Sequence, residues 1–255
     1  MSYRPEEDRI ECRQLSILLK DIDAKIHCNT FKAKKQDLDR ILESTKRYYE
    51  EIGNEYDDLW YSPNAYVQYD KLYSFLQRKI SQLSSYGELV LDAGCGTCEW
   101  STVLMKNGAL VVGFDQSLKM LQIGREKSIS RGFWTNLNLI RGDLKLLPYK
   151  KRMFNGVTTL FVLGHLPDDK IGIFLEELAR VIKDEAWMLF VDTRLHEPHQ
   201  RQELLVRTLK SGKEYMVYKR YFTALELETL LEKSFHCSFS ALEIDRYVIC
   251  TTNHF

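Results

Sequence analysis

From Glu88 onward, short apolar runs alternate with helical segments, and few folds accommodate such a pattern. The runs that we interpret as strands are residues 89–94, 109–115, 136–143, 154–166 and 186–192. Apolar residues in the segments between them recur at spacings of three and four, which is typical of amphipathic helices. Because strands that alternate with helices pair side by side through crossovers, we expect an α/β fold with a doubly wound, mostly parallel sheet.

The last sixty residues follow a different pattern. Residues 200–212 have helical spacing, residues 214–222 alternate like an exposed strand, and residues 224–234 indicate a further helix. Residues 239–252 contain two extended runs. We therefore expect a seven-stranded sheet in which antiparallel strands are added at one edge.

The first 55 residues carry apolar positions at helical spacing, such as Leu15, Leu18 and Ile22. This spacing predicts a helical N-terminal arm over residues 1–55, followed by one α/β domain over residues 56–255. The helices of the arm could also serve as an interface between two copies of the chain, which would make a homo-oligomer.

The composition excludes several classes of protein. The 255 residues include 36 lysine and arginine residues and 36 aspartate and glutamate residues, which gives no general attraction to nucleic acid or to an anionic membrane. No apolar run reaches the roughly 18 residues of a membrane-spanning helix, and the polar, acidic start is unlike a signal peptide. Six scattered cysteines are too few for a disulfide framework. We expect a cytoplasmic protein that binds neither nucleic acid nor membrane.

The segment that ends the first predicted strand, Asp92 to Gly96, carries the strongest functional signal. Gly94 and Gly96 allow a tight turn and let a ligand approach the backbone. Asp115 ends the next strand, where a carboxylate can accept the hydroxyl hydrogens of a ribose. A dinucleotide-binding loop would have a third glycine at the position of Glu99, whose negative charge opposes a pyrophosphate. We therefore expect a nucleoside ligand without phosphate.

These residues resemble the first motif of the class I S-adenosylmethionine-dependent methyltransferases, hhDxGxGxG, which reads LVLDAGCGTC here. The resemblance extends through further motifs in order over residues 56–195. It implies a Rossmann-like fold, S-adenosyl-L-methionine as cofactor, and in-line methyl transfer to a small-molecule acceptor. One departure is Cys98, which replaces the third glycine of the motif, and we expect it to fit on a backbone with negative φ.

The resemblance also implies where the cofactor would lie. Gly94 and Gly96 would hold its amino-acid end, Asp115 its ribose and Asp143 its adenine. The residues that we expect to contact the cofactor are Asp92, Ala93, Gly94, Gly96, Trp100, Asp115, Gln116, Met120, Asp143, Leu144, Phe161 and Val162.

The acceptor side of the site is less well marked. His165 follows the fourth strand and is our candidate for a catalytic base, with orientation of its own loop as the alternative role. The aromatic segment before the first strand resembles a lid in the same family. The residues that we assign to the lid or the acceptor are Tyr56, Tyr61, Tyr66, Tyr69, His196 and Tyr221.

Three other functions are compatible with parts of the sequence: an NAD-binding oxidoreductase, a non-catalytic subunit that binds S-adenosylmethionine, and a thioredoxin-like protein that uses Cys95 and Cys98. No second cysteine pair completes a zinc site, and we expect no metal. Methyltransferases of nucleobase amino groups resemble one another in a D/N-P-P-aromatic run, which is absent at residues 159–162. Whether oxygen, nitrogen, carbon or sulfur accepts the methyl group is open.

Overall fold

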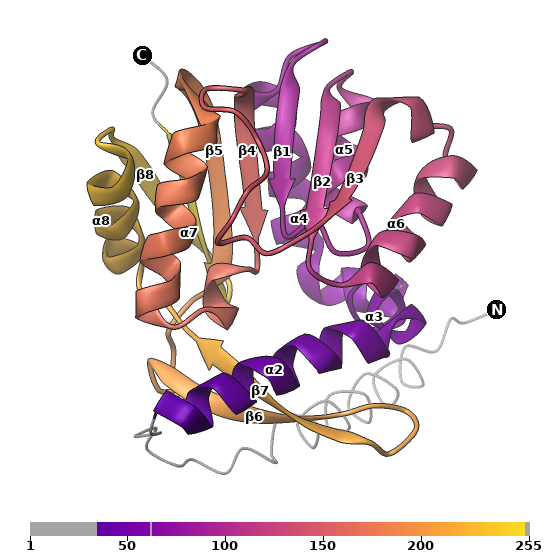
Figure 1. Cartoon of the computed structure of the whole chain (residues 1–255), viewed down its shortest axis with the longest axis vertical. Coiled ribbons are helices and arrows are strands. Elements are labelled where there is room, and N and C mark those ends of the chain that lie inside the picture. Colours follow the sequence, from indigo (N-terminus) through magenta and orange to yellow (C-terminus); the bar gives the residue numbers. More distant parts are fainter. Residues whose placement is uncertain (1–34, 62, 253–255) are drawn as a thin grey trace, which may run out of the picture.

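The computed structural model describes residues 35–61 and 63–252, although the side chains of residues 35–37, 54 and 63–69 are not described. Its centre is a seven-stranded sheet with the order β3-β2-β1-β4-β5-β9-β8 (Figure 1). The strands are β1 (Leu89–Ala93), β2 (Leu110–Asp115), β3 (Leu137–Arg141), β4 (Phe154–Leu160), β5 (Ile182–Thr193), β8 (Phe239–Ile244) and β9 (Tyr247–Thr252). The first five are parallel and β9 is antiparallel to both neighbours, so the predicted fold class is confirmed.

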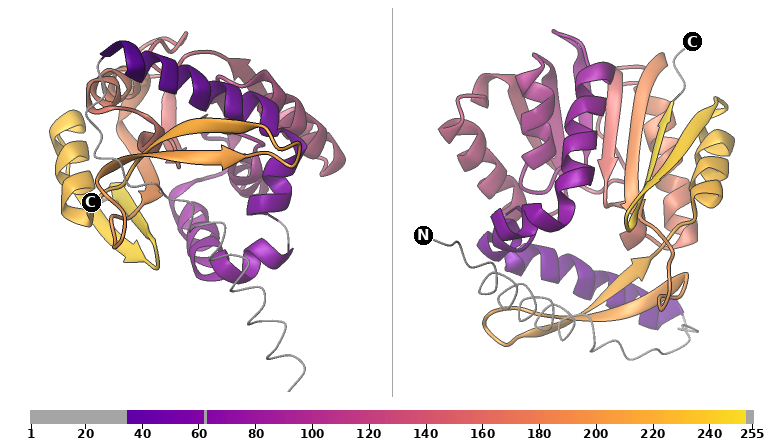
Figure 2. Two further views of the ribbon diagram at one scale, coloured as in Figure 1. Left: turned by 90° about the horizontal axis from the view of Figure 1, so that it is seen from below. Right: turned by 180° about the vertical axis from the view of Figure 1, so that it is seen from behind.

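Helices cover both faces of this sheet (Figures 1 and 2). On one face lie α4 (Pro63–Leu83), α5 (Glu99–Lys106) and α6 (Leu118–Ser130), and on the other α7 (Asp168–Val181) and α8 (Ala224–Phe235). Side chains of successive residues in a strand point to opposite faces, so Leu91 packs on one layer and Val90 on the other. Burial on both faces explains why the central strands have near-continuous apolar sequences.

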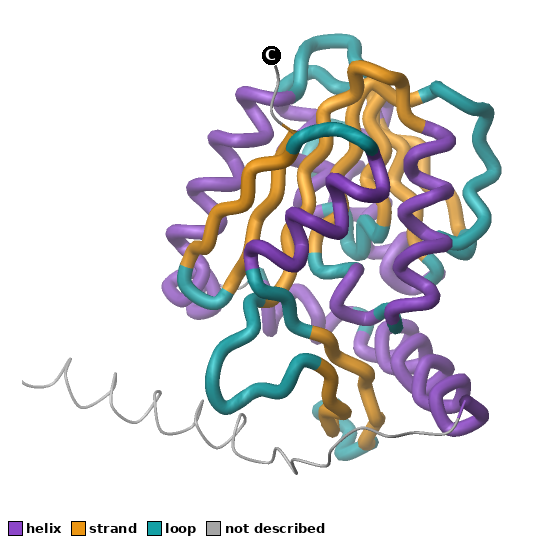
Figure 3. The backbone as a smooth tube through the Cα atoms, turned by 90° about the vertical axis from the view of Figure 1, so that its left-hand side faces the viewer, coloured by secondary structure: helices purple, strands orange, loops and turns teal. Residues whose placement is uncertain are grey.

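A second layer closes the end of the sheet where the parallel strands finish. It consists of α2 (Lys35–Ile52), α3 (Asn54–Trp60) and the two-stranded hairpin of β6 (Gln202–Thr208) and β7 (Glu214–Arg220) (Figures 1 and 3). We call these elements the cap.

The two parts of the cap are joined by hydrogen bonds between α2 and the edge of β7. The backbone N–H of Met216 donates to Ser44 Oγ at 3.1 Å, and that of Tyr218 donates to Thr45 Oγ1 at 3.0 Å. Tyr48 and Ile52 of α2 pack with Val217 in a small separate core.

The prediction of a helix over residues 200–212 is wrong, because most of this segment is strand β6 and a turn. The apolar pair Leu204 and Leu205 suits either element, and the full ladder with β7 decides in favour of a strand. Residues 214–222 are also not an exposed strand of the main sheet. They belong to the hairpin, and most of their side chains are buried.

Residues 1–34 of the predicted arm lie outside the described residues, and the division of the chain at residue 55 stays a prediction. None of the helices in the described ranges combines the length and the apolar character that a bilayer span requires.

Candidate functional site

A pocket lies where β1 and β4 end, beside the glycine loop after β1. About 310 Å³ there is not filled by protein atoms, and part of this space is open to solvent. The residues that line the pocket are Tyr56, Tyr61, Asp92, Gly94, Cys95, Gly96, Thr97, Trp100, Leu160 and Phe161. Ligands of α/β proteins bind at this end of parallel strands, so the pocket has the position that the sequence predicted.

The two glycines of the loop have backbone conformations that favour glycine. Gly94 has a φ of +82°, and a Cβ added there would lie 2.3 Å from a methyl group of Val162. Gly96 has a φ of +50°, and a Cβ added there would meet nothing within 4 Å. Gly94 therefore permits close packing of the loop on the segment after β4, while Gly96 leaves open space that a side chain would fill.

Cys98 differs from the expectation of a negative φ. Its φ is +61°, in the left-handed region that favours glycine. The side chain is fully buried and directed toward α6, where a Cβ added to Gly124 would lie 2.4 Å from Cys98 Sγ. Cys98 is therefore accommodated by a glycine on the neighbouring helix and does not line the pocket.

Two carboxylates flank the glycine loop. Asp115 accepts hydrogen bonds of 2.9 Å from the backbone N–H groups of Gly96 and Ser117, while burial raises its pKa. Asp92 accepts hydrogen bonds from Ser101 at 2.5 Å and from Thr158 at 2.9 Å, and burial raises its pKa to about 6. Asp115 thus sets the conformation of the loop, and Asp92 ties β1 to β4 and α5 beneath it.

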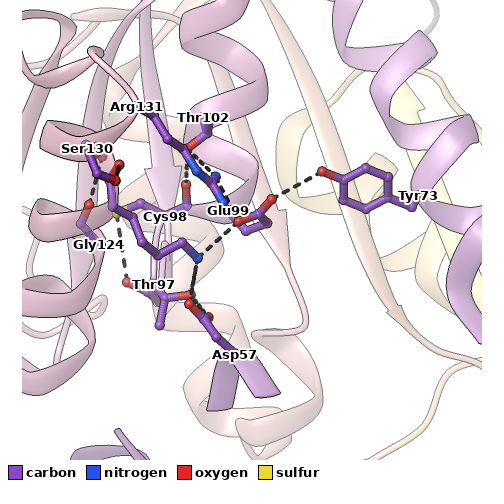
Figure 4. A network of polar contacts seen from close by, with 12 residues as sticks. Asp57, Tyr73, Thr97, Cys98, Glu99, Thr102, Gly124, Ser130 and Arg131 are labelled. Atoms are coloured by element: carbon purple, nitrogen blue, oxygen red, sulfur yellow. Dashed lines mark hydrogen bonds and ion pairs between the residues drawn. The ribbon is translucent and has the colours of Figure 1, made fainter. Parts of the chain in front are cut away.

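A network of polar contacts fastens the cap to the loop (Figure 4). Lys127 Nζ of α6 lies 2.9 Å from Asp57 of α3 and 3.0 Å from Glu99 of α5. The hydroxyl of Thr97 in the loop donates to Asp57 at 2.6 Å, and Arg131 makes a second ion pair with Glu99 at 3.0 Å. Lys127 therefore connects three helices around the pocket.

These contacts correct one step of the sequence interpretation. Burial alone would raise the pKa of Glu99, but Lys127 and Arg131 lower it below its ordinary value. Because its charge is balanced by these two cations, Glu99 does not by itself argue against a pyrophosphate at the loop.

A row of aromatic rings leads from the pocket toward the hairpin. Tyr61 and Tyr56 have ring centroids 6.1 Å apart, Tyr56 and Tyr49 6.2 Å, and Tyr49 and His165 5.2 Å. Tyr56 and Tyr61 thus lie where the sequence placed a lid, whereas Tyr49 was not predicted. The side chains of Tyr66 and Tyr69 lie outside what the structure describes.

His165 has a partner at each ring nitrogen. Nδ1 lies 3.0 Å from the carbonyl oxygen of Tyr218, and Nε2 lies 2.8 Å from the Tyr49 hydroxyl. Since a carbonyl only accepts, Nδ1 donates and Nε2 accepts, which describes a neutral imidazole. Burial, with the charges of Lys219 and Arg207 nearby, lowers its pKa to about 3. The predicted role as a base stays a prediction, and these surroundings favour a positioning role.

The other predicted site residues are spread around this region. The Asp143 side chain is 59% exposed and pairs with Lys145, although the neighbouring Gly142 N–H donates to the backbone carbonyl of Asp115. Gln116 is exposed, whereas Met120 is buried beneath Tyr48 and Ile52. None of these three predicted residues lines the pocket, and their contacts with a cofactor stay predictions.

The predicted acceptor residues His196 and Tyr221 lie together at the base of the hairpin. His199 links them, because its ring stacks on Tyr221 at 4.5 Å and lies 4.9 Å from His196. His199 Nδ1 and the Tyr221 hydroxyl both contact one oxygen of Glu203, at 2.7 and 2.6 Å. The described part of the chain brings together no group of three or more residues suited to a metal ion, and the absence of a metal stays a prediction.

Several residues at the site were missed by the sequence interpretation. Cys95, Thr97 and Leu160 line the pocket, and each adjoins a predicted motif. Arg207 lies on β6 and Lys219 on β7 of the hairpin. Alternation of side chains along these strands would have been the sequence signal for them.

Comparison with known proteins identifies related domains. Residues 90–185 match a family described as "Methyltransferase domain". A demethylmenaquinone methyltransferase of Staphylococcus aureus is 30% identical over 155 residues, which cover 59% of this chain and 61% of that protein. The corresponding enzyme of Staphylococcus carnosus is 34% identical over 143 residues, covering 51% and 57%. The chain thus spans about three-fifths of the length of these relatives.

Solved structures share the fold over most of the chain. A DhpI complex with S-adenosylhomocysteine superposes with a TM-score of 0.69 at 23% identity, covering 84% of this chain and 96% of that one. A 1,6-didemethyltoxoflavin-N1-methyltransferase from Burkholderia thailandensis, with bound 1,6-didemethyltoxoflavin and S-adenosylhomocysteine, has a TM-score of 0.59 at 14% identity, covering 88% and 92%.

Proposed function

We propose that this chain, whose residues 90–185 form a methyltransferase domain of the class I fold, transfers a methyl group from S-adenosylmethionine to a small-molecule acceptor. The observation that carries the proposal is the glycine loop. Asp115 holds this loop open through the Gly96 N–H, directly beside a pocket with aromatic walls. We also propose that the protein acts in the cytoplasm.

The residues of the pocket fit the proposed cofactor. Gly96 leaves open space where any side chain would intrude, which suits a ligand that lies against the backbone. The indole N–H of Trp100 is buried in the wall beside Tyr61, so the wall carries polar groups as well as aromatic surface. The ring faces of Tyr56 and Tyr61 attract cations, as a sulfonium requires.

Bound S-adenosylmethionine supplies an electrophilic methyl group on a positively charged sulfur. The chain contributes position: the glycine loop would hold the amino-acid end, Asp115 the ribose, and Phe161 and Val162 the region near the sulfur. Tyr56 and Tyr61 line the same pocket and would lie against the bound cofactor. Holding two reactants in line can contribute about 7–11 kcal/mol toward lowering the barrier, and the reaction needs no metal.

The proposal is tested by thermal-shift titration of the purified chain with S-adenosylhomocysteine, NAD and dithiothreitol in parallel. A ligand of the native state raises the unfolding midpoint by an amount that grows with its concentration relative to Kd. We expect a shift with S-adenosylhomocysteine alone. Gly96→Arg should abolish that shift because the side chain fills the open space, and Cys98→Ser should retain it because residue 98 faces α6.

Other outcomes would support the alternatives. A shift with NAD alone would favour an oxidoreductase, and a shift with S-adenosylhomocysteine but no turnover on any acceptor would favour a non-catalytic subunit. Loss of the protein's only activity in Cys98→Ser would favour a redox function. Burial raises the pKa of the Cys95 thiol well above its ordinary value, which is opposite to what a reactive thiol needs.

A further inference from the structure

The hairpin of the cap presents two cations on one face. Side chains alternate along a strand, so Glu203, Leu205 and Arg207 share one face of β6. In the register of the hairpin, Lys219 lies opposite Glu203, and Tyr215 lies opposite Arg207. Tyr215 packs in the small core beneath α2, so this is the face that the hairpin turns toward the rest of the molecule.

Arg207 lacks a counter-ion. Its side chain is half-buried, and within the described residues its guanidinium forms no ion pair and no hydrogen bond. It nevertheless lies close enough to Tyr49 and His165 for its charge to act on both groups. The five N–H donors of its guanidinium are open to solvent and make no contact with a carboxylate, so they are available to an anion.

Lys219 lies beside His165. Its side chain is buried, and its ammonium makes an ion pair with Asp192 at 3.2 Å, which uses one of three N–H donors. A Cβ added to Gly164 would lie 2.6 Å from Lys219 Nζ, so this ammonium borders the segment that carries His165.

The carboxylate on this face of the hairpin does not balance Arg207. Glu203 makes no ion pair with Arg207, and its Oε1 is already contacted by His199 and Tyr221. The Asp192 carboxylate accepts from Lys219, from the Gly164 N–H at 2.7 Å and from the Thr193 N–H. Of the two cations, Lys219 is paired with Asp192, whereas Arg207 has no carboxylate partner among the described residues.

The cations are continuous with the cofactor pocket. Phe161 lines the pocket, and the chain then passes through Val162 and Gly164 to His165, beside Lys219. On the side of the cap, the row of rings from Tyr61 through Tyr49 also connects the pocket with His165. An acceptor with one end at Arg207 would thus have its other atoms directed toward the pocket.

We propose that the methyl acceptor is a small acid, that Arg207 and Lys219 hold its carboxylate or phosphate-type group, and that an anionic oxygen of this group receives the methyl. The inference rests on the proposed function. Arginine binds such planar or multidentate oxyanions through paired hydrogen bonds, which orient the group as well as attract it.

This acceptor class agrees with the chemistry that the site offers. The oxyanion forms a bond to the methyl carbon while the carbon–sulfur bond breaks, and the electron pair of that bond stays on sulfur. The acceptor loses one negative charge on becoming an ester and the sulfonium becomes a neutral thioether, so no proton is released and no base is needed. That fits His165, whose acceptor nitrogen is occupied by the Tyr49 hydroxyl.

The test measures anion binding separately from turnover. Isothermal titration of the chain saturated with S-adenosylhomocysteine would compare benzoate and phenylphosphonate with the neutral benzamide. We expect at least one of the two acids to bind and benzamide to bind about tenfold or more weakly. Arg207→Gln should weaken binding of the acid by about tenfold or more, and Arg207→Lys should retain part of it.

Arg47→Gln is the matched control, because Arg47 lies on α2, pairs with Glu43 and has a side chain that is 68% exposed. It removes the same charge and should leave acid binding unchanged, and S-adenosylhomocysteine should bind all three variants equally. Equal binding of acids and benzamide, no binding of either acid at millimolar concentration, or equal effects of Arg207→Gln and Arg47→Gln would overturn the inference. Methylation of a neutral phenol or quinol in preference to acids would also overturn it. Failure of S-adenosylhomocysteine to bind would instead contradict the proposed function.

Discussion

Cys98 and Gly124 act as a pair. The glycine loop requires a left-handed backbone at position 98, which costs a non-glycine residue of order 1 kcal/mol. The buried thiol is accommodated because residue 124 on α6 has no Cβ to collide with it. The volume of the Cys98 side chain is therefore matched by a glycine on the next helix.

This pairing predicts strong coupling between the two positions. Gly124→Ala should destabilise the protein by about 1–3 kcal/mol, because the new methyl group would overlap Cys98 Sγ. In a Cys98→Gly background the same substitution should cost much less. Urea unfolding of the two single variants and the double variant measures the coupling, and additive effects would show that the contact is unimportant.

His165 should make the stability of the folded protein depend on pH. Its pKa is about 3 in the folded chain and about 6.5 when unfolded, so the folded state prefers the neutral ring. The stability that this contributes is complete above pH 6.5 and is lost as the pH falls from 6.5 toward 3. Between pH 7 and 5 the loss should be about 2 kcal/mol.

Urea unfolding at pH 7 and pH 5 checks this expectation. The wild-type free energy of unfolding should fall by about 2 kcal/mol more than that of His165→Gln, whose side chain does not titrate. The same pH dependence in both proteins would mean that the ring protonates freely in the folded state.

Among the elements, α3 depends on contacts with the rest of the molecule. It has only seven residues, Asn54–Trp60, too few for a stable isolated helix. Asp57 joins it to Thr97 (Figure 4) and to Lys127. The Lys127 ammonium also lies 5.3 Å from the centre of the Tyr61 ring. One lysine on α6 therefore holds both the short helix and one wall of the pocket.

Loss of this lysine should release α3 without unfolding the sheet. In Lys127→Gln we expect backbone amides of residues 54–61 to exchange hydrogen about tenfold faster or more, and S-adenosylhomocysteine to bind more weakly. Arg125→Gln is the control, since Arg125 lies on the same helix but contacts Trp134 at the surface. Hydrogen-exchange mass spectrometry distinguishes the two, and equal effects would show that Lys127 does not restrain α3.

The elements of the main sheet could be predicted because each carries its own signal. Strands such as β1 and β2 are buried on both faces, so most of their residues are apolar. Strand β6 has no such signal, since its pairing with β7 lies across a turn and is decided by tertiary contacts. Interpreting residues 200–212 as a helix also hid the shared face of Arg207 and Glu203.

At the scale of the whole molecule, the position of the site was predicted mainly from the order and direction of the strands and less from individual residues. Parallel strands end at one edge of the sheet, which is why Gly94, Asp115 and Phe161 could be brought together from the sequence alone. The cap could not be predicted in the same way. Its elements α2 and the hairpin are joined by contacts between residues 172 and 173 apart in sequence, so they meet only in the folded chain.

The hydrogen bonds from β7 to α2 have a consequence for the behaviour of the protein in solution. An uncovered outer strand exposes a row of donors and acceptors to which a strand of another molecule can attach. Ser44 and Thr45 occupy the N–H groups of Met216 and Tyr218 with hydroxyl oxygens, and a helix cannot continue a β-ladder. Helix α2 thereby protects this edge of the hairpin against aggregation.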